Sequence, residues 1–113
     1  YAVPYRARPA YCYTVEDSVY VAPSARQRGV GLALLSALLS GCEIWGARQM
    51  VAIVGDPAAN NASIRLHKKA GFRSVGTLVG VGRKFDSWLD SLILQRPLGH
   101  GISTNPGDPR VPV

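Results

Sequence analysis

The chain has 113 residues, enough for one domain at most, and hydrophobic residues make up 47% of it. Its formal net charge is +6, but the basic residues are scattered singly and in pairs, which argues against a nucleic-acid-binding arm and favours a small anionic partner. The longest apolar stretch, residues 32–39, is interrupted by Ser36 and is too short to span a bilayer, so we expect no membrane segment.

Hydrophobic patterns in the first half of the chain predict a strand, a helix and a second strand. Residues 13–21 are rich in β-branched and aromatic side chains, which is typical of a strand. From about residue 28 to residue 47 apolar side chains recur at helical spacing, and Gly46 is expected to close this helix. Residues 49–55 form a continuous apolar run, which indicates a strand buried on both faces.

The second half predicts another helix and a hairpin. Residues 61–70 form the helix, which Gly71 stops, and residues 72–82 and 87–96 form two strands. The order is therefore β-α-β-α-β-β, with a right-handed crossover, a partly parallel sheet and a final antiparallel hairpin. We predict an α/β domain over residues 1–98 and a disordered tail, rich in proline and glycine, over residues 99–113.

A basic turn containing two glycines precedes the first predicted helix. Gly29 and Gly31 allow close approach to the backbone, where the first N–H groups of a helix lack intrahelical partners. Arg26 and Arg28 add positive charge to the helix dipole, so the turn suits a phosphate group. It is not a Walker A loop, because no Gly-Lys-Ser/Thr sequence follows. It is not a dinucleotide fingerprint either, because Leu34 stands in place of the third glycine. From the glycines alone, an ordinary helix start is an equal alternative.

Three motifs in order resemble the GNAT superfamily of acetyl-CoA-dependent N-acetyltransferases. RQRGVG at 26–31 resembles its pyrophosphate-binding motif, and NNASIRLHKKAGF at 60–72 resembles its second cofactor motif. Residues 82–96 resemble the C-terminal hairpin of the phosphinothricin and methionine sulfoximine acetyltransferase branch. The resemblance covers roughly residues 1–98 and implies a GNAT-like α/β fold. Family members have further strands and helices before the position of Tyr1, so we expect the C-terminal, cofactor-binding part of the domain.

The resemblance also implies site residues by position. Those expected to bind acetyl-CoA are Val19, Tyr20, Val21, Gln27, Arg28, Gly29, Val30, Gly31, Leu32, Asn60 and Lys69. Those expected to contact the substrate are Arg6, Arg8, Glu16, Asp17 and Ser18. An arginine fork suits a carboxylate-bearing substrate, although Arg6 and Arg8 are also compatible with solvated loop residues.

Two residues are expected to be catalytic. Glu16 matches an acidic residue proposed as general base in this branch, and Asp17 is its rival because adjacent strand residues point to opposite faces. His67 occupies the position where many family members have a Tyr that protonates the leaving thiolate. The alternatives are a solvated strand residue for Glu16 and an ordinary helix-surface residue for His67. Phe85 stands where some phosphinothricin enzymes have a His, which argues against strict phosphinothricin specificity.

The resulting expectation is an N-acetyltransferase that moves an acetyl group from acetyl-CoA to the amino group of a small amino-acid-like substrate. The alternative is a truncated, non-catalytic module that binds acetyl-CoA or another anion, and a nucleic-acid-binding role rests only on the charge. No metal is expected, and a homodimer follows from the resemblance. Cys12 and Cys42 match no metal spacing or disulfide framework, so we expect small core fillers in a reduced, cytoplasmic protein.

Overall fold

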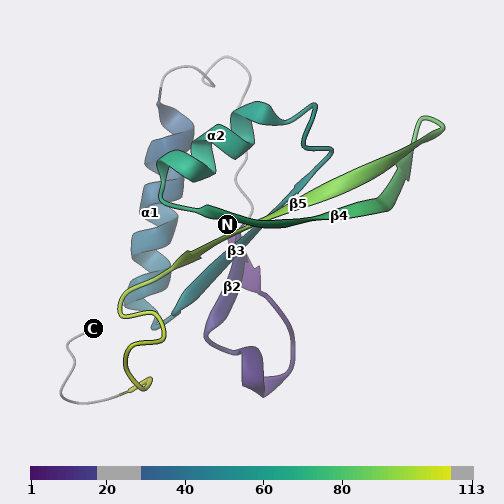
Figure 1. Cartoon of the computed structure of the whole chain (residues 1–113). Helices are drawn as coiled ribbons and strands as arrows, with labels where there is room; N and C mark the ends of the chain where they lie inside the picture. Colours follow the sequence, from purple (N-terminus) through teal and green to yellow (C-terminus); the bar gives the residue numbers. More distant parts are fainter. Residues whose placement is uncertain (18–28, 108–113) are drawn as a thin grey trace.

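The computed structural model describes residues 1–17 and 29–107 of the chain. Within these residues two α-helices accompany one mixed sheet of five strands (Figure 1). The elements in chain order are β1 (Ala2–Pro4), the 3-10 helix η1 (Pro9–Tyr11), β2 (Thr14–Asp17), α1 (Val30–Ile44), β3 (Gln49–Gly55), α2 (Asn61–Lys69), β4 (Arg73–Lys84) and β5 (Ser87–Pro97). The predicted β-α-β-α-β-β order is confirmed from β2 onward, with β1 and η1 ahead of it.

The sheet has the strand order β1-β2-β3-β5-β4. β2 and β3 are parallel, and the pairs β1–β2, β3–β5 and β4–β5 are antiparallel. The predicted crossover and hairpin are therefore both present. The hairpin places its second strand, β5, beside β3, so that β4 forms the far edge of the sheet.

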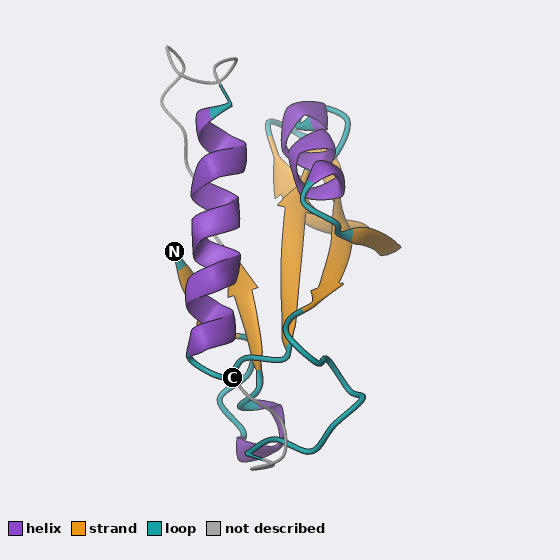
Figure 2. Ribbon diagram, turned by 90° about the vertical axis from the view of Figure 1, so that its left-hand side faces the viewer, coloured by secondary structure: helices purple, strands orange, loops and turns teal. Residues whose placement is uncertain are grey.

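Both helices lie on one face of the sheet, which we call the helix-covered face (Figure 2). The connections β2–α1–β3 and β3–α2–β4 cross the sheet in the same direction, and right-handed crossovers then place both helices on the same side. Met50, Ala52 and Val54 of β3 point into this layer and are buried. The core that they form with the helices and β5 consists of Leu35, Leu39, Ala47, Met50, Ala52, Val54, Phe72, Leu94 and Leu98.

No described helix covers the opposite side, which we call the open face. Side chains alternate along a strand, so the neighbours of the buried β3 residues point to this side. Val51 is half-buried there, and Ile53 is 47% exposed. The sequence prediction that β3 is buried on both faces is therefore wrong for the described residues.

The first helix is shorter than predicted at both ends. Gly29 is the N-cap residue of α1, with a φ of 72°, and Gly46 follows the helix with a φ of 92°. Residues other than glycine rarely adopt this left-handed region, so the two glycines fix where the helix begins and ends. Gly46 lies just past the C-cap residue Trp45, which supports its predicted role in closing the helix.

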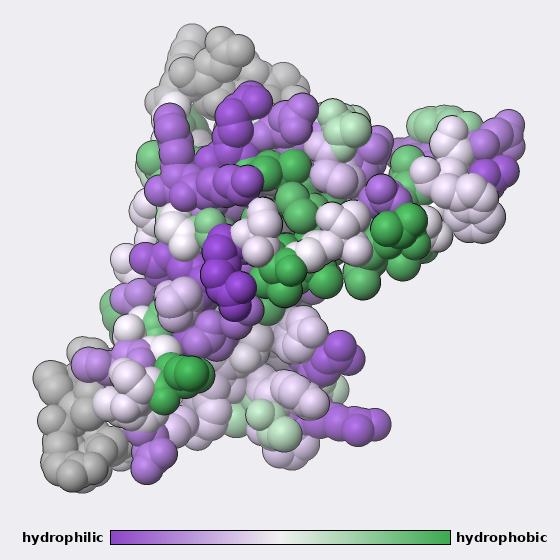
Figure 3. Space-filling view, viewed as in Figure 1, coloured by the Kyte–Doolittle hydropathy of each residue, from purple (hydrophilic) through white to green (hydrophobic). Residues whose placement is uncertain are grey.

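The hairpin of β4 and β5 projects from the body of the molecule (Figure 1). A bulge between Leu78 and Gly82 interrupts its ladder, and the Gly80 N–H donates a hydrogen bond of 2.9 Å to Oδ1 of Asp90. Apolar side chains gather over these strands on the face seen in Figure 3. Val79 of β4 is 80% exposed.

The segment after β5 packs against the domain as far as residue 107. The Arg48 guanidinium donates hydrogen bonds to the carbonyl oxygens of Gly101, Thr104 and Asn105 at 2.8, 3.3 and 3.2 Å. Residues 101–105 thus have contacts with the domain, and the predicted disorder of the tail over residues 99–113 stays a prediction. Composition could not reveal these contacts, because Arg48 binds backbone carbonyl groups and no particular side chain. Residues 108–113 lie outside the described part of the chain.

The two cysteines lie in different surroundings. Cys42 packs against the core from α1, as expected for a small core filler. Cys12 is exposed after η1, so the same expectation is wrong there. Both are free thiols.

Candidate active site

The candidate site lies at the carboxyl ends of the described parallel strands β2 and β3. Their register runs through the pairs Thr14–Gln49, Val15–Met50 and Glu16–Val51. β3 then continues to Gly55 with β5 as its partner on the other side. In open α/β sheets, ligands bind outside the carboxyl ends of the strands, which is the edge where β2 and β3 end.

The two acidic residues at the end of β2 face opposite sides of the sheet. Val15 packs against the core, so the alternation of a strand directs Asp17 to the helix-covered face and Glu16 to the open face. Glu16 is half-buried between its register partners, Val3 of β1 and Val51 of β3. The two rivals for the role of base are therefore separated by the sheet.

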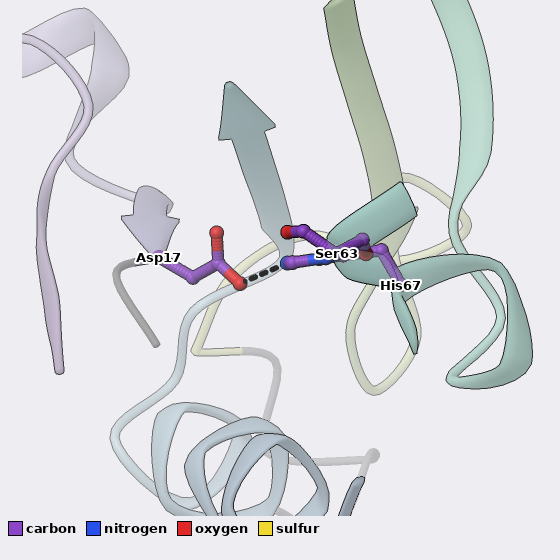
Figure 4. Close-up of polar contacts among 3 residues, drawn as sticks. All are labelled: Asp17, Ser63 and His67. Atoms are coloured by element: carbon purple, nitrogen blue, oxygen red, sulfur yellow. Dashed lines mark hydrogen bonds and ion pairs between the residues drawn. The ribbon is translucent and has the colours of Figure 1, made fainter. Parts of the chain in front are cut away.

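Asp17 is paired with a histidine of α2. Its Oδ2 atom lies 2.6 Å from Nε2 of His67, and the Asp17 and His67 side chains are 4% and 6% exposed (Figure 4). His67 Nδ1 lies 2.7 Å from the carbonyl oxygen of Ser63, one turn earlier in the helix. His67 is thus no helix-surface residue, and both of its ring nitrogens have partners.

The surroundings of His67 favour its protonated form. Burial lowers the pKa of His67, but the hydrogen bond to Asp17, the hydrogen bond to Ser63 and the Asp17 charge raise it further than burial lowers it. The net effect is a pKa above the ordinary value of 6.5. The Phe72 ring covers the imidazole edge-on at a centroid distance of 4.9 Å.

The start of α1 offers backbone donors. At this end of the helix the Ala33 N–H donates a hydrogen bond of 3.1 Å to the Gly29 carbonyl oxygen. The N–H groups of residues 30–32 precede that bond, and no side chain of the described residues caps this end. Gly29, Val30, Gly31 and Leu32 thus form the described part of the predicted phosphate-binding turn.

A shallow hollow of about 440 Å³ joins α1 to the end of α2. Leu32 and Lys69 both line it, so the structure brings together two residues predicted to bind the cofactor. Arg96 of β5 also lines the hollow, and its Nη1 lies 3.7 Å from Oε1 of Glu43. The sequence analysis did not identify Arg96, because its strand lies far from both helices along the chain.

Asn60 closes the loop between β3 and α2. Its side-chain amide donates hydrogen bonds to the carbonyl oxygens of Gly55 and Asp56, at 2.8 and 3.1 Å. This places Asn60 at the carboxyl end of β3, as the predicted cofactor contact requires. The contact itself stays a prediction.

The two arginines predicted to bind substrate share a hollow of about 680 Å³ in the loop between β1 and β2. The Arg6 guanidinium lies 4.8 Å from the Tyr5 ring centroid and 5.9 Å from that of Tyr11. Arg6 also donates a hydrogen bond of 3.3 Å to the Tyr5 hydroxyl. These aromatic contacts hold the Arg6 cation in place, and Arg8 lines the same hollow.

Several predicted site residues lie outside the described residues: Ser18, Val19, Tyr20, Val21, Gln27 and Arg28. Within residues 1–17 and 29–107, no group of three or more His, Cys, Asp or Glu residues is arranged to hold a metal ion. None of the helices in this part of the chain is long and apolar enough to cross a membrane.

Comparison with known proteins gives a consistent result. Residues 2–72 match the acetyltransferase (GNAT) family. Phosphinothricin N-acetyltransferase of Alcaligenes faecalis is 49% identical over 106 residues, which cover 94% of this chain and 53% of that protein. The L-methionine sulfoximine/L-methionine sulfone acetyltransferase of Salmonella typhimurium strain LT2 is 42% identical over 94 residues, covering 83% and 54%. The chain spans about half the length of the curated relatives it matches.

Solved structures agree with this result. A phosphinothricin acetyltransferase of the GNAT superfamily from Sinorhizobium meliloti, in complex with acetyl-CoA, superposes with a TM-score of 0.88 at 44% identity. The match covers 96% of this chain and 57% of that one. A putative acetyltransferase from Salmonella typhimurium with its cofactor acetyl-CoA gives a TM-score of 0.83 at 36% identity, covering 92% and 59%. The predicted α/β fold and the predicted family resemblance are both confirmed.

Proposed function

The chain belongs to the acetyltransferase (GNAT) family, and on this premise we propose that it serves the transfer of an acetyl group from acetyl-CoA to the amino group of a small amino-acid-like substrate. One observation carries the proposal. Glu16, at the carboxyl end of the described β2, faces the open side of the sheet, and Asp17 on the other side is already paired with His67. One carboxylate is therefore left to act as a base.

The described residues suit acetyl-CoA, which supplies the acetyl group as a thioester. Its phosphates are anionic, and the N–H groups at the start of α1 lie at the positive end of the helix dipole. Lys69 adds a cation in the hollow that Leu32 also lines. Asn60, at the end of β3, is the further candidate contact. The predicted contacts of Val19, Tyr20, Val21, Gln27 and Arg28 belong to the same proposal.

Glu16 has the chemistry of a general base. An amino group is protonated near neutral pH, and an ammonium cannot attack a thioester. We assign to Glu16 the removal of that proton, directly or through water. A backbone N–H of residues 19–21 then stabilises the oxyanion, and the sheet holds amine and thioester together. The C–S bond then breaks, and the nitrogen loses its second proton to give the amide. The thiolate gains a proton through water, since His67 Nε2 is engaged by Asp17.

The acceptor is proposed to carry a carboxylate. Arg6 and Arg8 line one hollow and offer planar guanidinium groups for a carboxylate. The names of the relatives refer to phosphinothricin and to methionine sulfoximine, both amino-acid analogues. Ser18 completes the proposed substrate contacts. A homodimer and a cytoplasmic location stay predictions.

A second candidate function is that of a module that binds acetyl-CoA without turnover. The backbone N–H groups at the start of α1 and the Lys69 cation suit the cofactor whether or not its acetyl group is transferred. A thiol-release assay on the chain separates the two. The same assay on the chain preceded by the remaining N-terminal residues of the Alcaligenes faecalis relative serves as comparison. Turnover only in the fusion would assign the binding role to this chain.

The cofactor assignment is tested by replacing Gly29 with Val and measuring coenzyme A affinity by calorimetry. Gly46→Val is the matched control, because Gly46 also has a positive φ, at the opposite end of the same helix. An added Cβ meets no atom within 4 Å at either position, so both variants carry similar backbone strain. We expect a loss of affinity in Gly29→Val only. Unchanged affinity in Gly29→Val, or equal losses in both variants, would contradict the assignment.

A further inference from the structure

The contact between Asp17 and His67 connects strand β2 with helix α2. Among the described residues the ladder between β2 and β3 runs as far as the pair Glu16–Val51, and Asp17 is the last described residue of β2. Its side chain reaches across the helix-covered face to α2 (Figure 4). The carboxyl end of the described β2 is therefore tied to α2.

The hydrogen bonds of His67 define where its protons lie. The Ser63 carbonyl oxygen can only accept, so Nδ1 must carry a hydrogen. Between Nε2 and Asp17 Oδ2, which lie 2.6 Å apart, there is then room for one shared proton. An imidazolium facing a carboxylate satisfies both partners, and the charges of the pair compensate each other in a buried place.

The neighbours of the pair are named here for residues 1–17 and 29–107 alone. Phe72 covers one side of the His67 ring. From α1, the titratable neighbour is Cys42: burial raises the pKa of its thiol, the amino terminus lowers it and the Asp17 carboxylate raises it further. The amino terminus lies next to Ala2, the register partner of Asp17. Asp17 is the partner that supports the charged form of His67, whose pKa is raised.

We propose that Asp17 and His67 form a proton-sharing latch that fixes the end of β2 against α2 and thereby holds the neighbouring Glu16 in its working position. Asp17 and His67 are positioning residues in this view. The role assigned to Glu16 rests on the proposed function, whereas the latch itself does not. Removing either partner leaves the other buried without its counter-charge, so the pair acts as a unit.

The proton arrangement is tested by nitrogen-detected NMR of the histidine side chains in the 113-residue chain. His67→Gln identifies which signals belong to His67, because the chain has two histidines. We expect both ring nitrogens of His67 to be protonated at neutral pH, and its pKa to lie above the ordinary value of 6.5. A His67 ring without a proton on Nδ1, or a pKa of His67 at or below 6.5, would overturn the latch.

The effect on position is tested with Asp17→Asn, His67→Gln and the double variant. We expect amide exchange at the end of β2 to rise by about ten-fold or more, relative to the β3–β5 ladder, in each single variant and no further in the double variant. A uniform rise across the sheet would indicate general destabilisation and overturn the latch.

Acetyl transfer by the same variants tests the link to Glu16. We expect kcat to fall by about ten-fold in each single variant, with no further fall in the double variant and an acetyl-CoA KM within about two-fold of the wild-type value. If amide exchange in β2 rises in these variants but kcat stays normal, the proposal that the latch positions Glu16 is overturned. If the wild-type chain transfers no acetyl group even in the fusion, the proposed function fails, and the NMR and exchange results still decide the latch.

Discussion

The two faces of the sheet differ in how deeply they bury neighbouring side chains of one strand. On the helix-covered face, Asp17 is 4% exposed and bound to His67, and Met50 of the adjacent strand is fully buried. On the open face, Glu16 is half-buried and Ile53 is 47% exposed. A shift of one residue along β2 thus separates a carboxylate that is paired with His67 from the one to which we assign the role of base.

The difference shows how a short strand can carry both stability and function. Alternation along a strand gives each face its own set of residues, so the helix-covered face can be packed without constraining the open one. The two sets remain mechanically linked through the backbone, because Glu16 and Asp17 are consecutive. We therefore compare variants in pairs, with one residue of each pair on the helix-covered face and the other on the open face.

The largest effect is expected for Glu16→Gln, which keeps the shape of the side chain and removes its basicity. If Glu16 is the base, kcat for acetyl transfer should fall by about 10²–10⁴-fold, the usual scale for one positioned acid–base group. The deficit should shrink as pH rises, because more of the substrate amine is then neutral. Steady-state kinetics on the active protein provide the measurement, with coenzyme A affinity expected to change little.

Asp17→Asn is the matched variant for this prediction. A larger loss of kcat in Asp17→Asn than in Glu16→Gln would assign the base to the helix-covered face and reverse the comparison. Near-normal rates in both variants would leave deprotonation to water, in which case the proposed mechanism fails although the fold stands.

A second pair of variants compares side-chain packing on the two faces of β3. Met50→Ala removes a fully buried side chain and should lower the free energy of unfolding by about 2–5 kcal/mol. Ile53→Ala removes a side chain that is 47% exposed and should cost about 1 kcal/mol or less. Urea unfolding of both variants measures the difference. Equal losses would show that another segment or a second copy covers the open face in solution.

The elements of the fold were predictable where periodicity is strong. The apolar run of β3 and the helical spacing of α1 predicted their positions to within a few residues, and Gly46 and Gly71 predicted the helix ends. Hydrophobicity alone could not show that only one face of β3 is covered, because Val51 and Ile53 are as apolar as their buried neighbours. Coverage depends on which elements pack against the sheet, which is a property of the whole fold.

The single residues of the candidate site could be proposed from the sequence, but the contacts between them could not. The resemblance identified Glu16, Asp17 and His67 separately, but the pairing of Asp17 with His67 joins residues 50 positions apart. Ser63 was missed as a partner, although its spacing of four residues from His67 on one helix was a usable signal. The contacts of Arg48 with backbone carbonyl groups left no comparable signal in the sequence.

A third prediction concerns the pH dependence of the helix-covered face. Because the folded-state pKa of His67 is raised, its contribution to stability should be fully present below the ordinary value of 6.5 and lost as pH rises through the raised pKa. His67→Gln should therefore cost most at about pH 6, on the order of 1–3 kcal/mol, and less at about pH 9. Urea unfolding at both pH values measures this cost. A cost that grows with pH would contradict the charged pair.

The smallest effects are expected from the two cysteines, which extend the comparison beyond the strands. Cys42 packs against the core near Asp17, whereas Cys12 is exposed after η1. Cys42→Ser should cost about 1 kcal/mol, because a hydroxyl is harder to desolvate than a thiol, and Cys12→Ser should stay within about 0.5 kcal/mol. Thermal unfolding of the two variants measures this difference in stability.

A thiol reagent offers a second readout. Burial raises the pKa of Cys42, the amino terminus lowers it, and the Asp17 carboxylate raises it further. Cys12 should therefore react first at neutral pH. Faster reaction at Cys42 would show that α1 moves away from the sheet in solution. Side chains under α1 would then be no better protected from solvent than those on the open face.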